Sequence, residues 1–178
     1  MDNGARCYQR FLAGDEDALE EILDLYNRKL ILFINHVVNN LSEAEDLAAE
    51  AFLDLILKKP HFRQESSFKT YLFSIGRNKA MDFLNKQSRY KRIPLDDVQL
   101  GEQNLMLDEL DWDEQQKALL RALDALRPDY RDVLHLLYFE EMSYREAASV
   151  LKKSEKQINN LAFRAKNAIR STMQQEVP

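Results

Sequence analysis

The stretch from Ser42 to Arg92 constrains the fold of this chain more than any other part of the sequence. Ser42 followed three residues later by Glu45 is typical of the capping box that opens a helix. Pro60 predicts a break after that helix, and an apolar and aromatic run from about Phe68 predicts a second helix to about Arg92. Two consecutive helices are therefore expected here.

These two predicted helices carry opposite charge. Asp46, Glu50 and Asp54 recur every four residues, which places them on one face of the first helix. From Arg77 onward, the second helix has only Asp82 against six basic residues: Arg77, Lys79, Lys86, Arg89, Lys91 and Arg92. The first helix therefore suits a basic protein surface, and the second suits a polyanion.

The rest of the composition favours an all-α fold without a membrane anchor. Glycine and proline number only 4 each in 178 residues, which disfavours strand-and-turn architectures. Cys7 is the single cysteine and fits a reducing cytoplasm. The best apolar run, Leu30–Val38, is too short to span a membrane, and the N-terminus lacks a signal-peptide pattern. We expect a cytoplasmic protein with no direct membrane insertion.

Acidic residues are concentrated in one segment. The formal net charge is −5, but residues 93–116 contain eight acids and no Lys or Arg, so the other residues carry +3, the difference between −5 and −8. This segment also contains Pro94 and Gly101 and shows no helical period. We interpret it as a solvated linker; the alternative is an acidic mimic that competes with DNA for basic surfaces. The predicted organisation is a helical domain at 1–92, an acidic linker at 93–113 and a second helical domain at 114–178.

The second domain has the pattern of a helix-turn-helix. Ser143 with Glu146 forms another capping box, and Ser154 caps a final helix that lasts to about Met173. The helical period turns one apolar stripe of the final helix inward: Ile158, Leu161, Ala162, Ala165 and Ile169. The other face holds Lys156, Asn159, Asn160, Phe163, Asn167 and Arg170, with Arg164 at its edge. Basic and amide side chains suit major-groove readout, and Phe163 suits a thymine methyl or the sugar backbone. An ordinary exposed aromatic remains the alternative for Phe163.

Three of these motifs resemble one protein family. SEAEDLAAEAFLDL resembles region 2 of the extracytoplasmic-function group of bacterial sigma factors, and FKTYLFSIGRNKAMDFLNKQSR resembles its promoter-melting helix. SYREAASVLKKSEKQINNLAFRAKNAIR is similar to the region 4 helix-turn-helix of that group. The resemblance covers nearly the whole chain. It implies two small helical domains that bind RNA polymerase core and promoter DNA, with an anti-sigma factor as a candidate partner.

The resemblance also implies site residues. Asp46, Leu47 and Glu50 fall on the face that binds the clamp helices of the largest polymerase subunit, and Asn78 falls in a pocket for a flipped base, with residues 61–67 as its other wall. The basic residues near Asn78 are expected to contact minus-ten DNA: Arg77, Lys79, Lys86 and Arg89. Asn159, Asn160, Phe163 and Arg164 fall on the minus-35 contact positions, and Lys156 lies on the same face.

Other functions fit the sequence less well. Asp132–His135 is the only acid-x-x-His pair, whereas a di-iron bundle needs two such pairs and two further carboxylates. No Gly-rich phosphate loop or nucleophile elbow occurs, so we expect no enzyme, metal or cofactor. Tyr71 and Gly76 depart from the usual Trp and Ala of the family, so a promoter sequence cannot be transferred. The main alternative is a sigma-like interaction protein, a mimic or regulator partner that does not itself open promoters.

Overall fold

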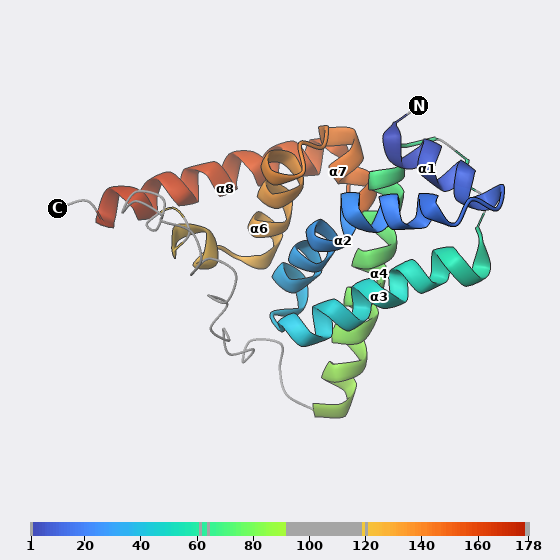
Figure 1. The fold of residues 1–178 in the computed structure, drawn as a ribbon. Helices are drawn as coiled ribbons and strands as arrows, with labels where there is room; N and C mark the ends of the chain where they lie inside the picture. The colour runs from blue at the N-terminus through green and yellow to red at the C-terminus, as the bar shows by residue number, and fades with distance from the viewer. Residues whose placement is uncertain (1, 61, 64, 92–118, 120, 177–178) are drawn as a thin grey trace.

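The computed structural model describes residues 2–60, 62–63, 65–91, 119 and 121–176, and no strand occurs among them (Figure 1). The elements in chain order are α1 (Asn3–Leu12), α2 (Asp17–Val38), α3 (Leu41–Lys58), α4 (Phe68–Lys91), α6 (Pro128–Leu134), the π-helix η3 (His135–Phe139), α7 (Tyr144–Leu151) and α8 (Glu155–Glu176). Residues 119 and 121–124 are also helical. The predicted all-α fold is confirmed. The predicted linker at 93–113 lies outside the described residues, and the two domain boundaries beside it stay predictions.

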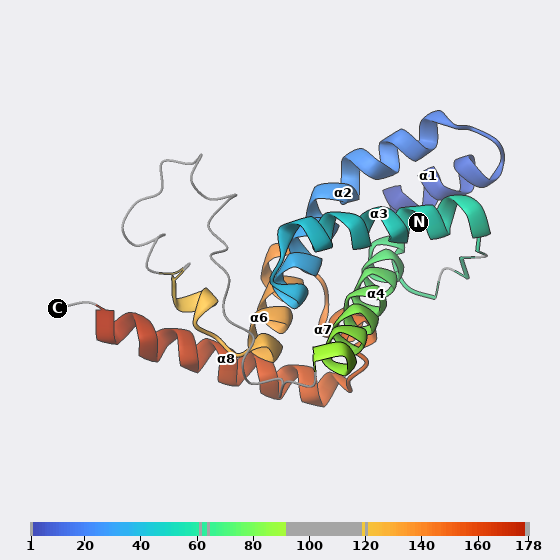
Figure 2. The same ribbon diagram turned by 90° about the horizontal axis from the view of Figure 1, so that it is seen from below.

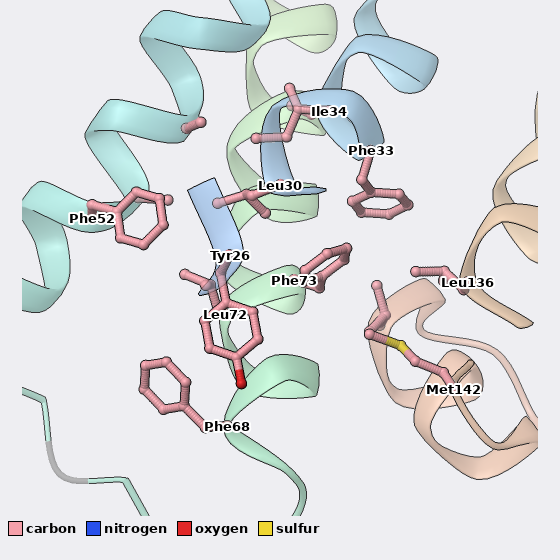
Figure 3. Close-up of a cluster of buried hydrophobic side chains, with 14 of the residues drawn as sticks. Tyr26, Leu30, Phe33, Ile34, Phe52, Phe68, Leu72, Phe73, Leu136 and Met142 are labelled. Carbon is pink, nitrogen blue, oxygen red and sulfur yellow. The ribbon is translucent and has the colours of Figure 1, made fainter. Parts of the chain in front are cut away.

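Helix α2 is the centre of the N-terminal bundle, because α1, α3 and α4 all pack against it. Its buried face carries Ile22, Leu30, Phe33 and Ile34, each with no exposed surface. Leu30 lies eight residues after Ile22, and Phe33 and Ile34 lie three and four residues after Leu30. All four therefore fall on one side of α2, which faces the neighbouring helices. Figure 3 shows Leu30 and Ile34 between the helices of the bundle.

Two polar side chains fix the ends of the bundle helices. The Asp2 carboxylate accepts hydrogen bonds from the backbone N–H of Ala5 at 2.8 Å and of Phe68 at 2.9 Å, so it caps both α1 and α4. Asn40, and not Ser42 as expected, caps α3, since its Oδ1 accepts from the backbone N–H of Glu43 at 3.1 Å. Asn is among the strongest N-cap residues, and its position two residues earlier places Ser42 inside the first turn.

The C-terminal helices form the predicted helix-turn-helix. The Ser143 side chain and Glu146 make a complete capping box at the start of α7. At the start of α8, the backbone N–H of Gln157 donates to Ser154 Oγ at 3.2 Å, and Gln157 Oε1 accepts from the backbone N–H of Ser154 at 2.8 Å. The helix that begins at Pro128 is regular only to Leu134 and then widens into η3.

The two ends of the chain share one hydrophobic core. Helix α4 lies along α7, and α2 lies along α6, in both views (Figures 1 and 2). Phe33 and Phe73 of the N-terminal bundle face Leu136 and Met142 of the C-terminal part (Figure 3). All four side chains are at most 5% exposed. The described N-terminal and C-terminal helices therefore pack together in this structure, which their sequence did not predict.

Candidate functional site

The outer face of α3 combines acids with exposed leucines. Asp46, Glu50, Leu53 and Leu57 stand at positions i, i+4, i+7 and i+11, which places them in one stripe along the helix. Leu53 is 49% exposed and Leu57 is 77% exposed. We call these four residues the α3 outer stripe. Exposed leucines beside carboxylates suit a protein partner whose surface is both apolar and basic.

Leu47 does not belong to this stripe. Its side chain is only 7% exposed and is part of the hydrophobic core, so the structure separates it from Asp46 and Glu50, with which it was predicted to form a binding face. Sequence reasoning instead missed Leu53 and Leu57. Their spacing from Asp46 is the signal that identifies them, because seven and eleven residues return to the same side of a helix.

Part of the acidic row of α3 is already paired within the chain. Asp54 lies 2.8 Å from Lys58 Nζ and 2.9 Å from Lys79 Nζ, and these two lysines lower the pKa of its carboxyl. Lys79 Nζ also lies 3.6 Å from Glu50 Oε2. The side chain of Lys79 is 20% exposed and faces α3. Of the predicted DNA-contacting residues, Lys79 is therefore turned toward the α3 carboxylates.

The exposed face of α4 carries amide and basic groups. Asn78, Asp82, Asn85 and Arg89 follow one another at helical spacing and are all exposed, and Lys86 is exposed at the edge of this row. We call these five residues the α4 exposed face. The structure thus brings together three of the predicted residues, Asn78, Lys86 and Arg89, on one side of a helix.

Arg77 points elsewhere. Its guanidinium lies 3.5 Å from Asp132 Oδ2 of α6, and its side chain is 17% exposed. Near the start of α4, Phe62 is 9% exposed and packs edge-on against Phe68, with ring centroids 5.7 Å apart. This contact anchors the described part of the 61–67 segment, which was expected to form a wall of a base pocket.

Helix α8 presents the five predicted residues to solvent. Lys156, Asn159, Asn160, Phe163 and Arg164 are all exposed, and Phe163 is 67% exposed. On the opposite side, Ile158, Ala162 and Ala165 are at most 1% exposed, while Leu161 and Ile169 are half-buried. The buried stripe holds the helix against α6 and α7, and so fixes the direction of the exposed row. Such a row of cations and amides on a helix-turn-helix suits the major groove.

One further cation of α8 is held by an aromatic ring. Lys166 Nζ lies 4.9 Å from the ring centroid of Tyr138, and hydrogen bonding to Tyr138 raises the pKa of Lys166. Tyr138 belongs to η3 and is 51% exposed.

Among the described helices, none is long and apolar enough to cross a membrane. The exposed residues described above lie on three separate helices, α3, α4 and α8.

Comparison with known families matches two segments of the chain. Residues 22–90 match the model "Sigma-70 region 2", and residues 116–169 match "Sigma-70, region 4". Among curated proteins, the ECF RNA polymerase sigma factor SigX of Bacillus subtilis is 28% identical and covers 89% of this chain and 85% of its own length. The ECF RNA polymerase sigma-E factor of Escherichia coli is 27% identical and covers 93% and 92%.

Two solved structures share the fold. The sigma factor RpoE in complex with the anti-sigma factor NepR from Bartonella quintana has a TM-score of 0.67 at 23% identity, covering 88% of this chain and 97% of that one. CnrH in complex with the cytosolic domain of CnrY has a TM-score of 0.64 at 18% identity, covering 97% and 96%. The α3 outer stripe and the α4 exposed face lie in the first matched segment, and the exposed row of α8 lies in the second.

Proposed function

We infer the function of this chain from its membership of the sigma-70 family, in the extracytoplasmic-function group: it binds the RNA polymerase core enzyme and directs transcription initiation at specific promoters. The observation that carries this proposal is the exposed row of α8, with five predicted DNA-reading residues set on a buried apolar stripe. We further propose that the protein is not a catalyst itself and that it acts in the cytoplasm. An anti-sigma factor is a candidate partner, since RpoE of Bartonella quintana is solved in complex with one.

The α3 outer stripe is the proposed contact with the polymerase core enzyme. Asp46 and Glu50 supply negative charge, and Leu53 and Leu57 supply apolar surface that water covers in the free chain. The stripe extends over eleven residues of helix, or about 16 Å. Burying two leucines would contribute the larger part of the affinity, while the carboxylates would set orientation and association rate.

The α4 exposed face is the proposed contact with the minus-ten element. Asn78 offers both a donor and an acceptor for the edge of an extruded base, whereas Lys86 and Arg89 offer charge to the phosphates. Extruding a base costs a few kcal/mol of stacking, so backbone contacts beside the pocket must offset it. In the structure described here, Arg77 and Lys79 have acidic partners and would need to exchange them before binding phosphate.

The exposed row of α8 is the proposed reader of the minus-35 element. Arg164 is suited to a bidentate contact with guanine, and Asn159 or Asn160 to adenine. Promoter-selective transcription is the direct test. Purified polymerase core enzyme, mixed with this protein and genomic DNA, should start transcripts at a defined set of sites that the core enzyme alone does not use. A complex with core enzyme that starts no transcripts would support the sigma-like interaction protein instead.

A further inference from the structure

One lysine of α4 is paired with the acidic row of α3. Lys79 Nζ lies 2.9 Å from Asp54 Oδ2 and 3.6 Å from Glu50 Oε2, and its side chain is only 20% exposed. Glu50 belongs to the α3 outer stripe, the proposed contact with polymerase core enzyme. We propose that Lys79 limits the affinity for polymerase core enzyme, because it competes with cations of the polymerase for Glu50. The competition rests on the proposed function of the stripe, whereas the pairing of Lys79 within the chain does not.

Asp54 is the residue that holds Lys79 beside Glu50. Helix α4 packs against α3, which brings Lys79 to the acidic row while its neighbour Asn78 stays exposed. Asp54 Oδ1 lies 2.8 Å from Lys58 Nζ, and Oδ2 faces Lys79, so each oxygen of this carboxylate has one lysine. Hydrogen bonding to Lys58 and then to Lys79 lowers the pKa of the Asp54 carboxyl. A carboxylate outside the α3 outer stripe therefore keeps a cation within reach of one inside it.

The three carboxylates of the row are neutralised to different degrees. Asp46 is exposed and has no ion pair among the described residues. Glu50 is 59% exposed and meets one lysine at 3.6 Å, whereas Asp54 is 29% exposed and meets two lysines at shorter distances. The row extends over about 12 Å of helix. The attraction that it offers to a basic surface therefore decreases from Asp46 toward Asp54.

Lys79 and a cation of the polymerase cannot both pair fully with Glu50. An Arg binds a carboxylate best when it contacts both oxygens, but Oε2 of Glu50 already faces Lys79. Two cations beside one carboxylate also repel each other. Because an ion pair this exposed is weak, Lys79 lowers the fraction of chains with a free Glu50 and does not block the site. The expected cost is about twofold to fivefold in the apparent Kd for polymerase core enzyme.

The first test measures the association of the full-length protein with polymerase core enzyme, in the absence of DNA. Lys79→Met removes the competing cation and keeps most of the side-chain volume. Lys29→Met is the matched control, because it removes the same charge from an exposed position of α2 that lies outside the stripe. Glu50→Gln, alone and combined with Lys79→Met, shows whether the effect acts through Glu50.

We expect Lys79→Met to lower the apparent Kd about twofold to fivefold at about 0.15 M salt, with faster association, and Lys29→Met to match the wild type. The gain should disappear at about 1 M salt, where the Debye length is about 3 Å. It should also disappear when Glu50→Gln is present. Unchanged or weaker binding by Lys79→Met, or a gain that persists with Glu50→Gln, would overturn the proposal. Lys79→Gln replaces Lys79→Met in these measurements if the methionine lowers the melting temperature.

The second test examines the pairing without polymerase. A nuclear magnetic resonance titration of the Asp54 carboxyl in the free chain should show a pKa below its ordinary value, and Lys79→Met should raise that pKa. An unchanged pKa would mean that Lys79 does not pair with α3 in solution, which also overturns the proposal. If the pKa rises but none of the proteins binds polymerase core enzyme, the proposed function fails and the competition fails with it, while the pairing stands.

Discussion

Lowering the pH should weaken folding through His36, which lies on α2 where the C-terminal helices cover it. Its ring centroid lies 4.9 Å from that of His135, and its Nδ1 has no hydrogen-bond partner within the described part of the chain. Burial, followed by the charges of His135 and Arg131, lowers the pKa of His36 from 6.5 to about 3. The folded chain therefore keeps this imidazole neutral at pH values where the unfolded chain protonates it.

The sign and size of the effect follow from proton linkage. Because the pKa is lower in the folded state, the stabilisation is complete above the unfolded value of 6.5 and is lost as the pH falls toward 3. For these two pKa values, the free energy of unfolding should fall by about 2 kcal/mol between pH 7 and pH 5, and by about 1 kcal/mol if water partly reaches the ring. Asp132 acts in the opposite direction, because its raised pKa favours the folded state as pH falls. Comparing variants is therefore more informative than the wild type alone.

Urea unfolding followed by circular dichroism at pH 7 and pH 5 measures this difference. His36→Phe keeps a ring at the site and removes the titrating nitrogens, while Asp132 and Glu140 stay unchanged. The variant should lose about 1–2 kcal/mol less than the wild type over this range. If both proteins lose the same free energy, His36 is not held neutral and the reasoning is refuted.

Four further substitutions test single side chains. Leu57→Lys should reduce affinity for polymerase core enzyme about tenfold in a binding titration. The melting temperature should stay constant, because the side chain is 77% exposed. Unchanged affinity would exclude Leu57 from the interface. Ile158→Ala should lower the free energy of unfolding by about 2–5 kcal/mol, since the side chain is fully buried. Arg164→Ala should instead leave the free energy of unfolding unchanged. It should cost about 1–3 kcal/mol of discrimination at the minus-35 element, as measured by binding to mutated promoters. Gly76→Ala should lower the melting temperature, because the new Cβ would lie 2.7 Å from Leu30 Cδ1. Overpacking of this kind costs about 1–3 kcal/mol, whereas replacing Gly by Ala inside a helix gains about 1 kcal/mol. A higher melting temperature would mean that Leu30 moves aside freely.

Helix positions were predictable because they depend on local signals. The period of apolar residues and the capping residues identified α4, α7 and α8 to within a few residues. The start of α3 was misplaced since Asn40 and Ser42 are both good caps and only one can occupy the position. In sequence, Gly76 is only a departure from the usual Ala of the family, but in the structure its missing side chain is what lets Leu30 approach. That role depends on a partner helix, which a local pattern does not contain.

The segment from Arg131 to Leu136 could not be interpreted correctly from its own sequence. All six of its residues are buried, including Arg131, Asp132 and His135. Charged residues are almost never fully buried unless they are paired, so a helical pattern predicts that they face water. Here the partners come from the N-terminal bundle, as with Arg77 for Asp132. Leu47 is buried as the helical period predicts, and its role in binding the polymerase core enzyme stays a prediction from the resemblance.

The basic residues of α4 are divided because the C-terminal helices pack against the N-terminal bundle. Asn78 and Arg77 are neighbours in sequence, yet a rotation of about 100° per residue directs Arg77 to Asp132 and Asn78 to solvent. The charge count of the helix includes all of these cations, whereas in the structure Arg77 and Lys79 have acidic partners and Lys86 and Arg89 are exposed. The salt dependence of DNA binding measures how many of these cations contact phosphate, because each additional phosphate contact steepens it by roughly 0.7–0.9. Arg77→Gln should leave the slope unchanged if Arg77 keeps Asp132 as its partner on DNA, and a shallower slope would mean that Arg77 leaves Asp132 to contact a phosphate.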